Sequence, residues 1–248
     1  MRLGISSIIC PIVTSDILFS CGATKARLVL RVSTRANVMR LRVDSRTGGV
    51  VLTIPPGTSR SRALQWVETK RDWVEAMLGK VPEAIALAPG GTIPFRGVDH
   101  ELVWVEGASR RVECDGQSIR TGGQRESFEG RMTRWLQQQS LQVLTEETMD
   151  CAMRAGVEVS RVGVGDQRSR WGSCSSTGSI RYSWRLILAP DYVRRAIVAH
   201  EVAHRVHMNH GPEFHELAAR LAEGNAEKAH RWLRKHGAGL HRIGSQGR

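Results

Sequence analysis

The segment that most constrains this chain is His200-Glu201-Val202-Ala203-His204, which places two histidines four residues apart. On an α-helix this spacing puts both imidazoles on one face, one turn apart, where they can share a tetrahedral ion. Glu201 leaves the same turn at a different angle, so its carboxylate can reach a water on the metal. It would act as general base and then as proton donor to the leaving group. The segment therefore predicts a metal site built on a helix.

A third ligand is needed, because a catalytic zinc usually has three protein ligands and one open position. The downstream candidates are His207, His210, His215 and a carboxylate such as Glu216. His207 would lie about 10 Å from His200 along a straight helix, which is too far for easy convergence on one ion. His210 stands beside Gly211-Pro212, where the helix is expected to break and the chain can fold back. We therefore predict His200, His204 and His210 as ligands, with the other candidates left open.

The chain carries a strong positive charge. Its 248 residues include 36 Lys and Arg against 24 Asp and Glu, a formal net charge of +12. Such an excess favours polyanionic partners such as nucleic acid, and it is equally typical of a solvated basic surface. Residues 25–46 carry seven basic side chains against one acidic side chain. Weak, salt-sensitive DNA binding is the prediction for this stretch.

The cysteine pattern bears on the compartment. The five cysteines are widely spaced and form no C-x-x-C pair. An odd, scattered set argues against a disulfide framework and fits a reducing compartment, so we expect a cytoplasmic protein. No apolar run reaches the ~18–20 residues that span a bilayer. An N-terminal signal peptide is opposed by Pro11, Asp16 and the bulky Phe19.

Periodicity and turn residues divide the chain into four parts. We expect a disordered leader over residues 1–24, a β-rich region over 25–120, a helical domain over 121–236 and a basic tail over 237–248. Strands are predicted at 38–43, 50–54, 92–95, 101–105, 110–114 and 157–164, with a hairpin over 169–188. Helices are predicted over 61–78, 128–155, 190–205 and 212–223.

Several motifs, in a fixed order, resemble one known family. They are Arg170-Trp171-Gly172-Ser173-Cys174, Trp184-Arg185-Leu186, Pro190, the His200–His204 segment and Asn209-His210-Gly211-Pro212-Glu213-Phe214. Together they resemble the YgjP-like branch of the SprT-like zinc metallopeptidases over about residues 160–222, and the N-terminal half is a weaker match. The chain departs from the family's pattern at Ser183, Gly211 and His215, where Asn, Ser and Trp are usual. None of these departures removes a proposed ligand.

The resemblance implies an α+β fold with a zincin-like core over residues 121–236, in which helices pack on a small, mostly antiparallel sheet. The β-rich N-terminal region precedes this core. The resemblance also implies Zn²⁺ as cofactor, with Glu201 as catalytic acid and base and with the ligands His200, His204 and His210. The same imidazoles would accept manganese or cobalt, but availability and geometry favour zinc.

The Arg170–Cys174 segment has two interpretations. As the edge of a hairpin beside the metal-binding helix, it could bind an extended substrate by strand addition. We favour structural roles for Trp171 and Cys174, which would hold the sheet against the helix. A thiolate ligand from Cys174 would give a closed site, unlike that of a hydrolase.

Three functions fit these patterns. The preferred one is zinc-dependent hydrolysis of peptide bonds, with a protein or peptide as substrate. A second keeps the metal but cleaves nucleoside triphosphates as a pyrophosphatase, with phosphates bound by nearby arginines: Arg168, Arg170, Arg181 and Arg185. The third is a basic nucleic-acid-binding protein that acts near DNA.

Overall fold

The computed structural model describes residues 16–21, 24–44, 47–167 and 170–244. These form two compact units, Met1–Pro82 and Glu83–Arg248. Within the described residues, no helix is long and apolar enough to cross a membrane. The class is α+β, as expected, and the described ranges hold six α-helices and three small sheets.

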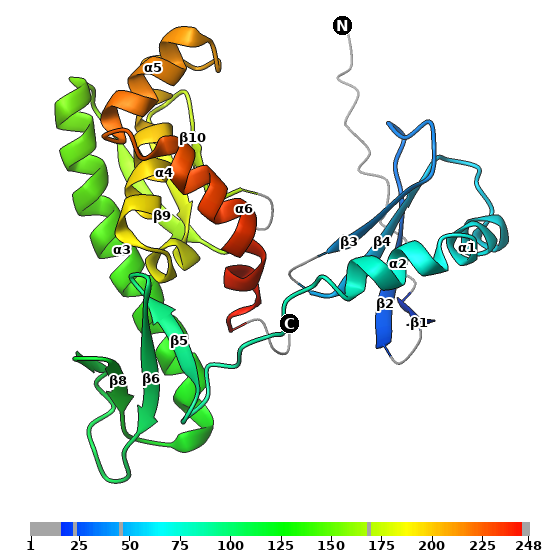
Figure 1. Ribbon diagram of the computed structural model, residues 1–248, viewed down its shortest axis with the longest axis horizontal. Coiled ribbons are helices and arrows are strands. Elements are labelled where there is room, and N and C mark those ends of the chain that lie inside the picture. Colours follow the sequence, from blue (N-terminus) through cyan, green and yellow to red (C-terminus); the bar gives the residue numbers. More distant parts are fainter. Residues whose placement is uncertain (1–15, 22–23, 45–46, 168–169, 245–248) are drawn as a thin grey trace, which may run out of the picture. The chain divides into compact units, whose positions relative to one another are not determined.

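The first unit is a four-stranded sheet covered by two helices (Figure 1). Its strands are β1 (Asp16–Cys21), β2 (Thr24–Val32), β3 (Arg40–Asp44) and β4 (Gly49–Ile54), in the order β1-β2-β4-β3. Val50, Leu52 and Ile54 of β4 are buried and alternate with less buried residues, because successive side chains point to opposite faces of a sheet. The expected β3–β4 hairpin is confirmed as an antiparallel pair.

Two expectations for this unit need correction. The leader expected over residues 1–24 is too long, since β1 pairs with β2 from Asp16 to Cys21; residues 1–15 lie outside the described part. The helix expected over 61–78 is two helices, α1 (Arg60–Glu68) and α2 (Arg71–Leu78). At the break, the Thr69 hydroxyl donates a hydrogen bond to the Trp66 carbonyl.

The second unit is organised along the 28-residue helix α3 (Phe128–Ala155) (Figure 1). Strands β5 (Thr92–Phe95), β6 (Val98–Trp104), β7 (Glu113–Asp115) and β8 (Ser118–Thr121) form one sheet, in the order β5-β6-β8-β7. The 3₁₀ turn η1 (Arg125–Ser127) leads into α3. Helix α3 ends as predicted at Gly156, whose left-handed conformation (φ 67°) suits a C-terminal glycine.

The remaining elements of this unit build the site. Strands β9 (Arg161–Gly165), β10 (Gly172–Cys174) and β11 (Ser179–Ser183) form a sheet in the order β10-β11-β9, followed by the 3₁₀ helix η2 (Trp184–Leu188). The strand expected to return over 180–188 therefore stops at Ser183. Three helices follow: α4 (Asp191–Ala203), α5 (Pro212–Leu221) and α6 (Ala226–Arg242).

The boundary between the units differs from the expected joint near residue 120. Ile93, Leu102 and Ile119 of the β5–β8 sheet are fully buried in the same core as Met132 and Leu136 of α3. Since they share one core, these strands belong with the helices, and the chain divides between Pro82 and Glu83.

The C-terminal end of the chain also differs from the basic tail expected over 237–248. Helix α6 continues to Arg242, and its Leu240 is buried in the same core. Ile243, which follows the helix, is 1% exposed. Residues 245–248 lie outside the described part.

Candidate metal centre

Helix α4 carries the first two histidines of the site. Its inner face is made of small and branched apolar residues, among them Ala199, Val202 and Ala203, which are fully buried. This packing fixes the helix against the core, while His200 and His204 are half-buried at its C-terminal end. The prediction of a buried helix carrying both histidines is confirmed.

The chain bends back after α4 and brings in a third imidazole. Between α4 and α5 the backbone turns, and Gly211 and Pro212 begin α5. One ring nitrogen from each of His200, His204 and His210 lies within 4.8 Å of the other two. The Nε2 atoms of His200 and His210 are 3.3 Å apart. Two nitrogens bound to one tetrahedral zinc at ~2.0–2.1 Å would be separated by about 3.3 Å, so this spacing fits a shared ion.

The His204 ring is held by the bend itself. Its Nδ1 lies 3.1 Å from the His207 carbonyl oxygen. Because a carbonyl only accepts, Nδ1 must carry the proton, which leaves Nε2 with a free lone pair. A hydrogen bond of this kind typically fixes the tautomer and orientation of a metal-binding histidine.

Phe214 packs against all three rings. It is 1% exposed, and its ring centroid lies 4.9 Å from that of His200, 4.5 Å from that of His204 and 4.7 Å from that of His210. Phe214, in the first turn of α5, is therefore the one side chain in contact with all three imidazole rings among the described residues. The sequence analysis noted Phe214 only as part of a motif.

The electrostatic environment favours the neutral form of His200 and of His204. Burial, followed by the neighbouring imidazoles of His204 and His210, lowers the pKa of His200 to about 4. Burial also lowers the pKa of His204, against a hydrogen bond to the His207 carbonyl that raises it. Neutral imidazoles offer lone pairs to a cation at physiological pH.

Glu201, the residue after His200 on α4, is buried against strand β10. Its residue is 5% exposed, and burial raises the pKa of its carboxyl to about 7, opposed by the charge of Arg170. A Cβ atom on Gly172 would lie only 2.6 Å from the Glu201 Cγ and 2.7 Å from its Cδ. Residue 172 must therefore be glycine for the carboxylate to sit where it does.

The other candidate ligands lie outside the group of three. The Nδ1 of His207 is 3.6 Å from the Glu213 carboxylate. His215 is exposed on α5, with its ring centroid 6.3 Å from that of His210. Glu216 is exposed. Cys174 is not among the grouped ligand atoms, and burial raises the pKa of its thiol, which favours the protonated form.

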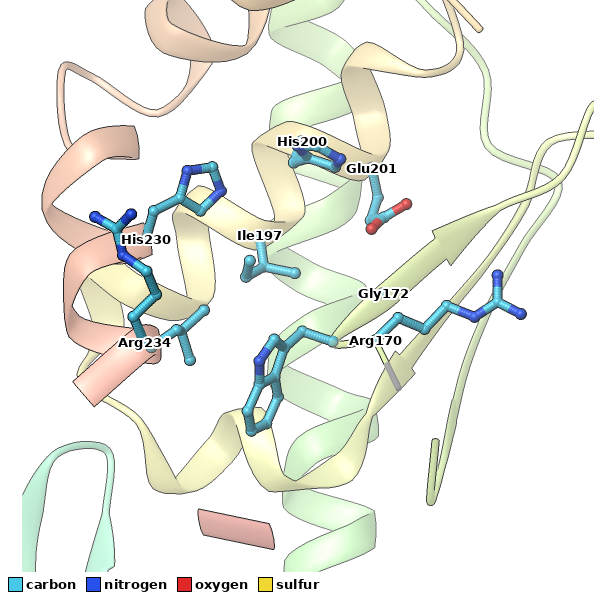
Figure 2. Close-up of a pocket in the computed structure, with 9 residues that line it drawn as sticks. Arg170, Gly172, Ile197, His200, Glu201, His230 and Arg234 are labelled. Atoms are coloured by element: carbon cyan, nitrogen blue, oxygen red, sulfur yellow. The ribbon is translucent and has the colours of Figure 1, made fainter. Parts of the chain in front are cut away.

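A cavity of about 490 Å³ opens beside His200 and Glu201 (Figure 2). Its floor and walls include Trp171, Gly172, Ile197 and Leu233, and Arg170, His230 and Arg234 also line it. In Figure 2 the Glu201 carboxylate points toward Gly172, and His230 lies on the opposite side of His200. The ring centroids of His200 and His230 are 6.4 Å apart. The site therefore has one wall from α4 and another from α6.

The α6 wall was missed by the sequence analysis. Its signal is the helical spacing of His230, Leu233 and Arg234, in which the two polar residues are one turn apart and the leucine is buried. Trp171 attaches this helix to the β10 hairpin: its indole stacks on His241 at 4.4 Å between centroids. A Cβ on Gly237 would lie 3.0 Å from the Trp171 ring. The structural role favoured for Trp171 agrees with this packing.

A triad of imidazoles with an adjacent buried carboxylate and an open cavity is the arrangement of a metal-dependent hydrolase. Residues 37–236 match the family described as "YgjP-like, metallopeptidase domain". The chain therefore belongs to the YgjP-like metallopeptidase family, and the match begins within the first unit and not at residue 121. No curated protein and no solved structure matches the chain.

Proposed function

We propose that this protein is a zinc metallopeptidase in which His200, His204 and His210 hold the ion and Glu201 moves the proton. The observation that carries the proposal is the convergence of three imidazoles, two of them with Nε2 atoms 3.3 Å apart, beside a buried carboxylate. A set of three histidines suits zinc and leaves one position open for catalysis.

The carboxylate of Glu201 is the only acidic group among the residues that line the cavity. When bound, zinc would polarise the substrate carbonyl and make a water a better nucleophile. Glu201 then takes a proton from the attacking water and returns it to the leaving amine nitrogen. The Glu201 side chain is buried and packs against Gly172, and this packing fixes the direction in which the carboxylate points.

Strand β10 gives the substrate a place to lie. It is the edge of its sheet, paired only with β11 among the described strands, and its Gly172 lines the cavity. An extended peptide can add to such an edge through main-chain hydrogen bonds. The side chains of Ile197 and Leu233 provide an apolar surface beside it.

The pyrophosphatase alternative has weaker support from the described arginines. Arg185 is 2% exposed, forms an ion pair with Asp166 and donates hydrogen bonds to the Ile243 carbonyl, so it serves the fold. Arg168 lies outside the described residues. Arg170 lines the cavity, and Arg181 is exposed on β11.

Metal content and activity of four proteins test the proposal. We expect about one zinc per wild-type chain, loss of zinc in His200→Ala and His210→Ala, and retention of zinc in Glu201→Gln. Cleavage of an unfolded protein such as reduced casein should be lost in all three variants. Zinc-loaded wild type that leaves unfolded proteins intact would count against a peptidase. Release of pyrophosphate from nucleoside triphosphates, abolished by Glu201→Gln, would instead show that the protein is a nucleotide pyrophosphatase.

A further inference from the structure

A group of arginines lies apart from the metal centre, on the N-terminal part of α3. Two adjoining cavities of about 620 Å³ and 450 Å³ are both lined by Arg110, Arg131 and Arg134. Arg111 lines the larger one, together with Trp135, Gln138 and Gln139. We call the four arginines the arginine cluster. No aspartate or glutamate among the described residues lines either cavity.

Helical spacing gathers the polar lining on one face of α3. Arg131, Arg134, Trp135 and Gln138 occupy positions i, i+3, i+4 and i+7, which lie on one side of an α-helix. The loop before β7 supplies Arg110 and Arg111 from the opposite side. Two elements far apart in sequence therefore direct guanidinium groups into the same space.

Arg131 is the buried member of the cluster. It is 9% exposed, its Nη2 donates a 2.7 Å hydrogen bond to the Gln124 carbonyl, and its Nε has no hydrogen-bond partner. A buried donor without a partner costs free energy, and a buried charge without a counter-charge costs more. An anion in the cavity would satisfy both needs.

Two glycines give the neighbouring arginines their positions. Gly123 has a left-handed backbone (φ 79°), and a Cβ there would lie 3.1 Å from the Arg110 Cδ. A Cβ on Gly130 would lie 3.3 Å from the Arg134 Nη1. The side chains of Arg110 and Arg134 thus pass close to the backbone of Gly123 and Gly130, where a larger residue would displace them. This placement directs both side chains into the cavities.

We propose that the arginine cluster is a binding site for phosphate groups, as carried by single-stranded nucleic acid or by a small polyphosphate. Guanidinium groups bind phosphate oxygens bidentately, and the amides of Gln138 and Gln139 add neutral donors. The cluster shares no residue with the cavity beside His200. The site is therefore separate from the proposed catalytic centre and does not depend on it.

Binding of a fluorescein-labelled single-stranded oligonucleotide to the full chain, measured by anisotropy over a range of salt, tests the proposal. The variant is Arg110→Gln/Arg134→Gln, which keeps the buried Arg131. The matched control is Arg60→Gln/Arg62→Gln, which removes the same charge from exposed positions on α1, outside the basic stretch 25–46. We expect the first variant to weaken binding at least about tenfold and to reduce the salt slope by about 1.4, the value for two lost phosphate contacts. The control should stay within about twofold of wild type.

Three further outcomes decide the proposal. Tripolyphosphate should displace the oligonucleotide from wild type and should not bind the first variant; if tripolyphosphate alone binds the cluster, the ligand is a small phosphate compound. Equal weakening in both double variants would show diffuse attraction and overturn the site. Poly-glutamate that binds the cluster as tightly as the oligonucleotide would overturn phosphate recognition. The melting temperatures of both double variants are measured before the binding assay. If that of Arg110→Gln/Arg134→Gln falls below wild type, Arg111→Gln, on the exposed loop, is used in its place.

Discussion

The two walls of the cavity beside His200 and Glu201 are built in different ways. On the α4 side, each proposed functional group is fixed by a neighbour: Phe214 packs against the three imidazoles, and Gly172 against Glu201. On the α6 side, His230 and Arg234 are exposed, and neither forms a hydrogen bond or ion pair with another residue of the described part of the chain. The first wall is preorganised for chemistry, and the second is free to contact a substrate.

This difference predicts which substitutions act on rate and which act on substrate binding. Groups that must meet an ion or a reacting water lose function after small displacements. Exposed groups that contact only the substrate contribute one hydrogen bond or ion pair each. The predictions below test that division, in order of expected effect.

Gly172→Ala should have the largest effect. The added Cβ would overlap the Glu201 side chain, so the carboxylate must move, and a displacement of about 1 Å costs roughly 100-fold in rate. We expect kcat/KM to fall by at least this factor while the zinc content stays at the wild-type level. Gly163→Ala, on β9 of the same sheet with open space for an added Cβ, is the control and should retain activity. A fully active Gly172→Ala would show that Glu201 acts from another position.

Phe214→Leu should weaken the metal site more than the fold. The substitution removes the ring that contacts all three imidazoles, and loss of such support typically costs 10–100-fold in metal affinity. Phe128→Leu is the matched control, since Phe128 is also 1% exposed and lies at the start of α3. Both should lower the free energy of unfolding by about 1–2 kcal/mol. Zinc titration against a chelator should separate them, and equal affinity would contradict the role of Phe214.

His230→Ala and Arg234→Ala should each lower kcat/KM moderately, because they remove contacts with the substrate alone. Each removes one donor from the α6 wall, and a hydrogen bond to a charged group contributes about 1.5 kcal/mol, or roughly tenfold in kcat/KM. Zinc content should not change. His236→Ala is the control on the same helix, because His236 stacks on Trp232 and does not line the cavity. Loss of zinc from His230→Ala would instead place this imidazole among the ligands.

The α4 wall could be predicted from sequence because its functional residues are close together in the chain. They lie on the last turn of α4 and in the bend that follows it. The spacing of His200 and His204 and the helix-breaking Gly211-Pro212 define it locally. The contact between Glu201 and Gly172 joins residues 29 positions apart, and no periodicity reports it. The α6 wall depends on Trp171 stacking against His241, which is a tertiary contact.

The expected domain joint failed for a related reason. The glycine-rich stretch 116–126 has the composition of a linker. In the structure it contains β8 and the first residues of the 3₁₀ turn η1, and Gly122 and Gly123 allow close packing against Ala108 and Arg110. Local composition cannot distinguish a flexible glycine from one required by a close contact.

The smallest predicted effect concerns the start of α4, which is anchored far from the ligands. The Asp191 carboxylate accepts hydrogen bonds from Arg96 and pairs with Arg194, which is fully buried and also binds Glu147. Burial alone would raise the pKa of Asp191, but the bonds from Arg96 and Arg194 outweigh it and lower the pKa from 3.8 to about 2.

Because the folded pKa of Asp191 lies below the unfolded one, this carboxylate stabilises the fold above about pH 4. The contribution is lost as the pH falls toward 2. We expect Asp191→Asn to lower the free energy of unfolding at neutral pH by about 1 kcal/mol, after allowance for solvent screening. The stability of the variant should also decline less steeply between pH 4 and 2. Urea unfolding across this range measures both, and parallel curves for wild type and variant would mean that Asp191 does not anchor α4. Asp99→Asn, which removes a carboxylate from an exposed position on β6, is measured alongside as the control.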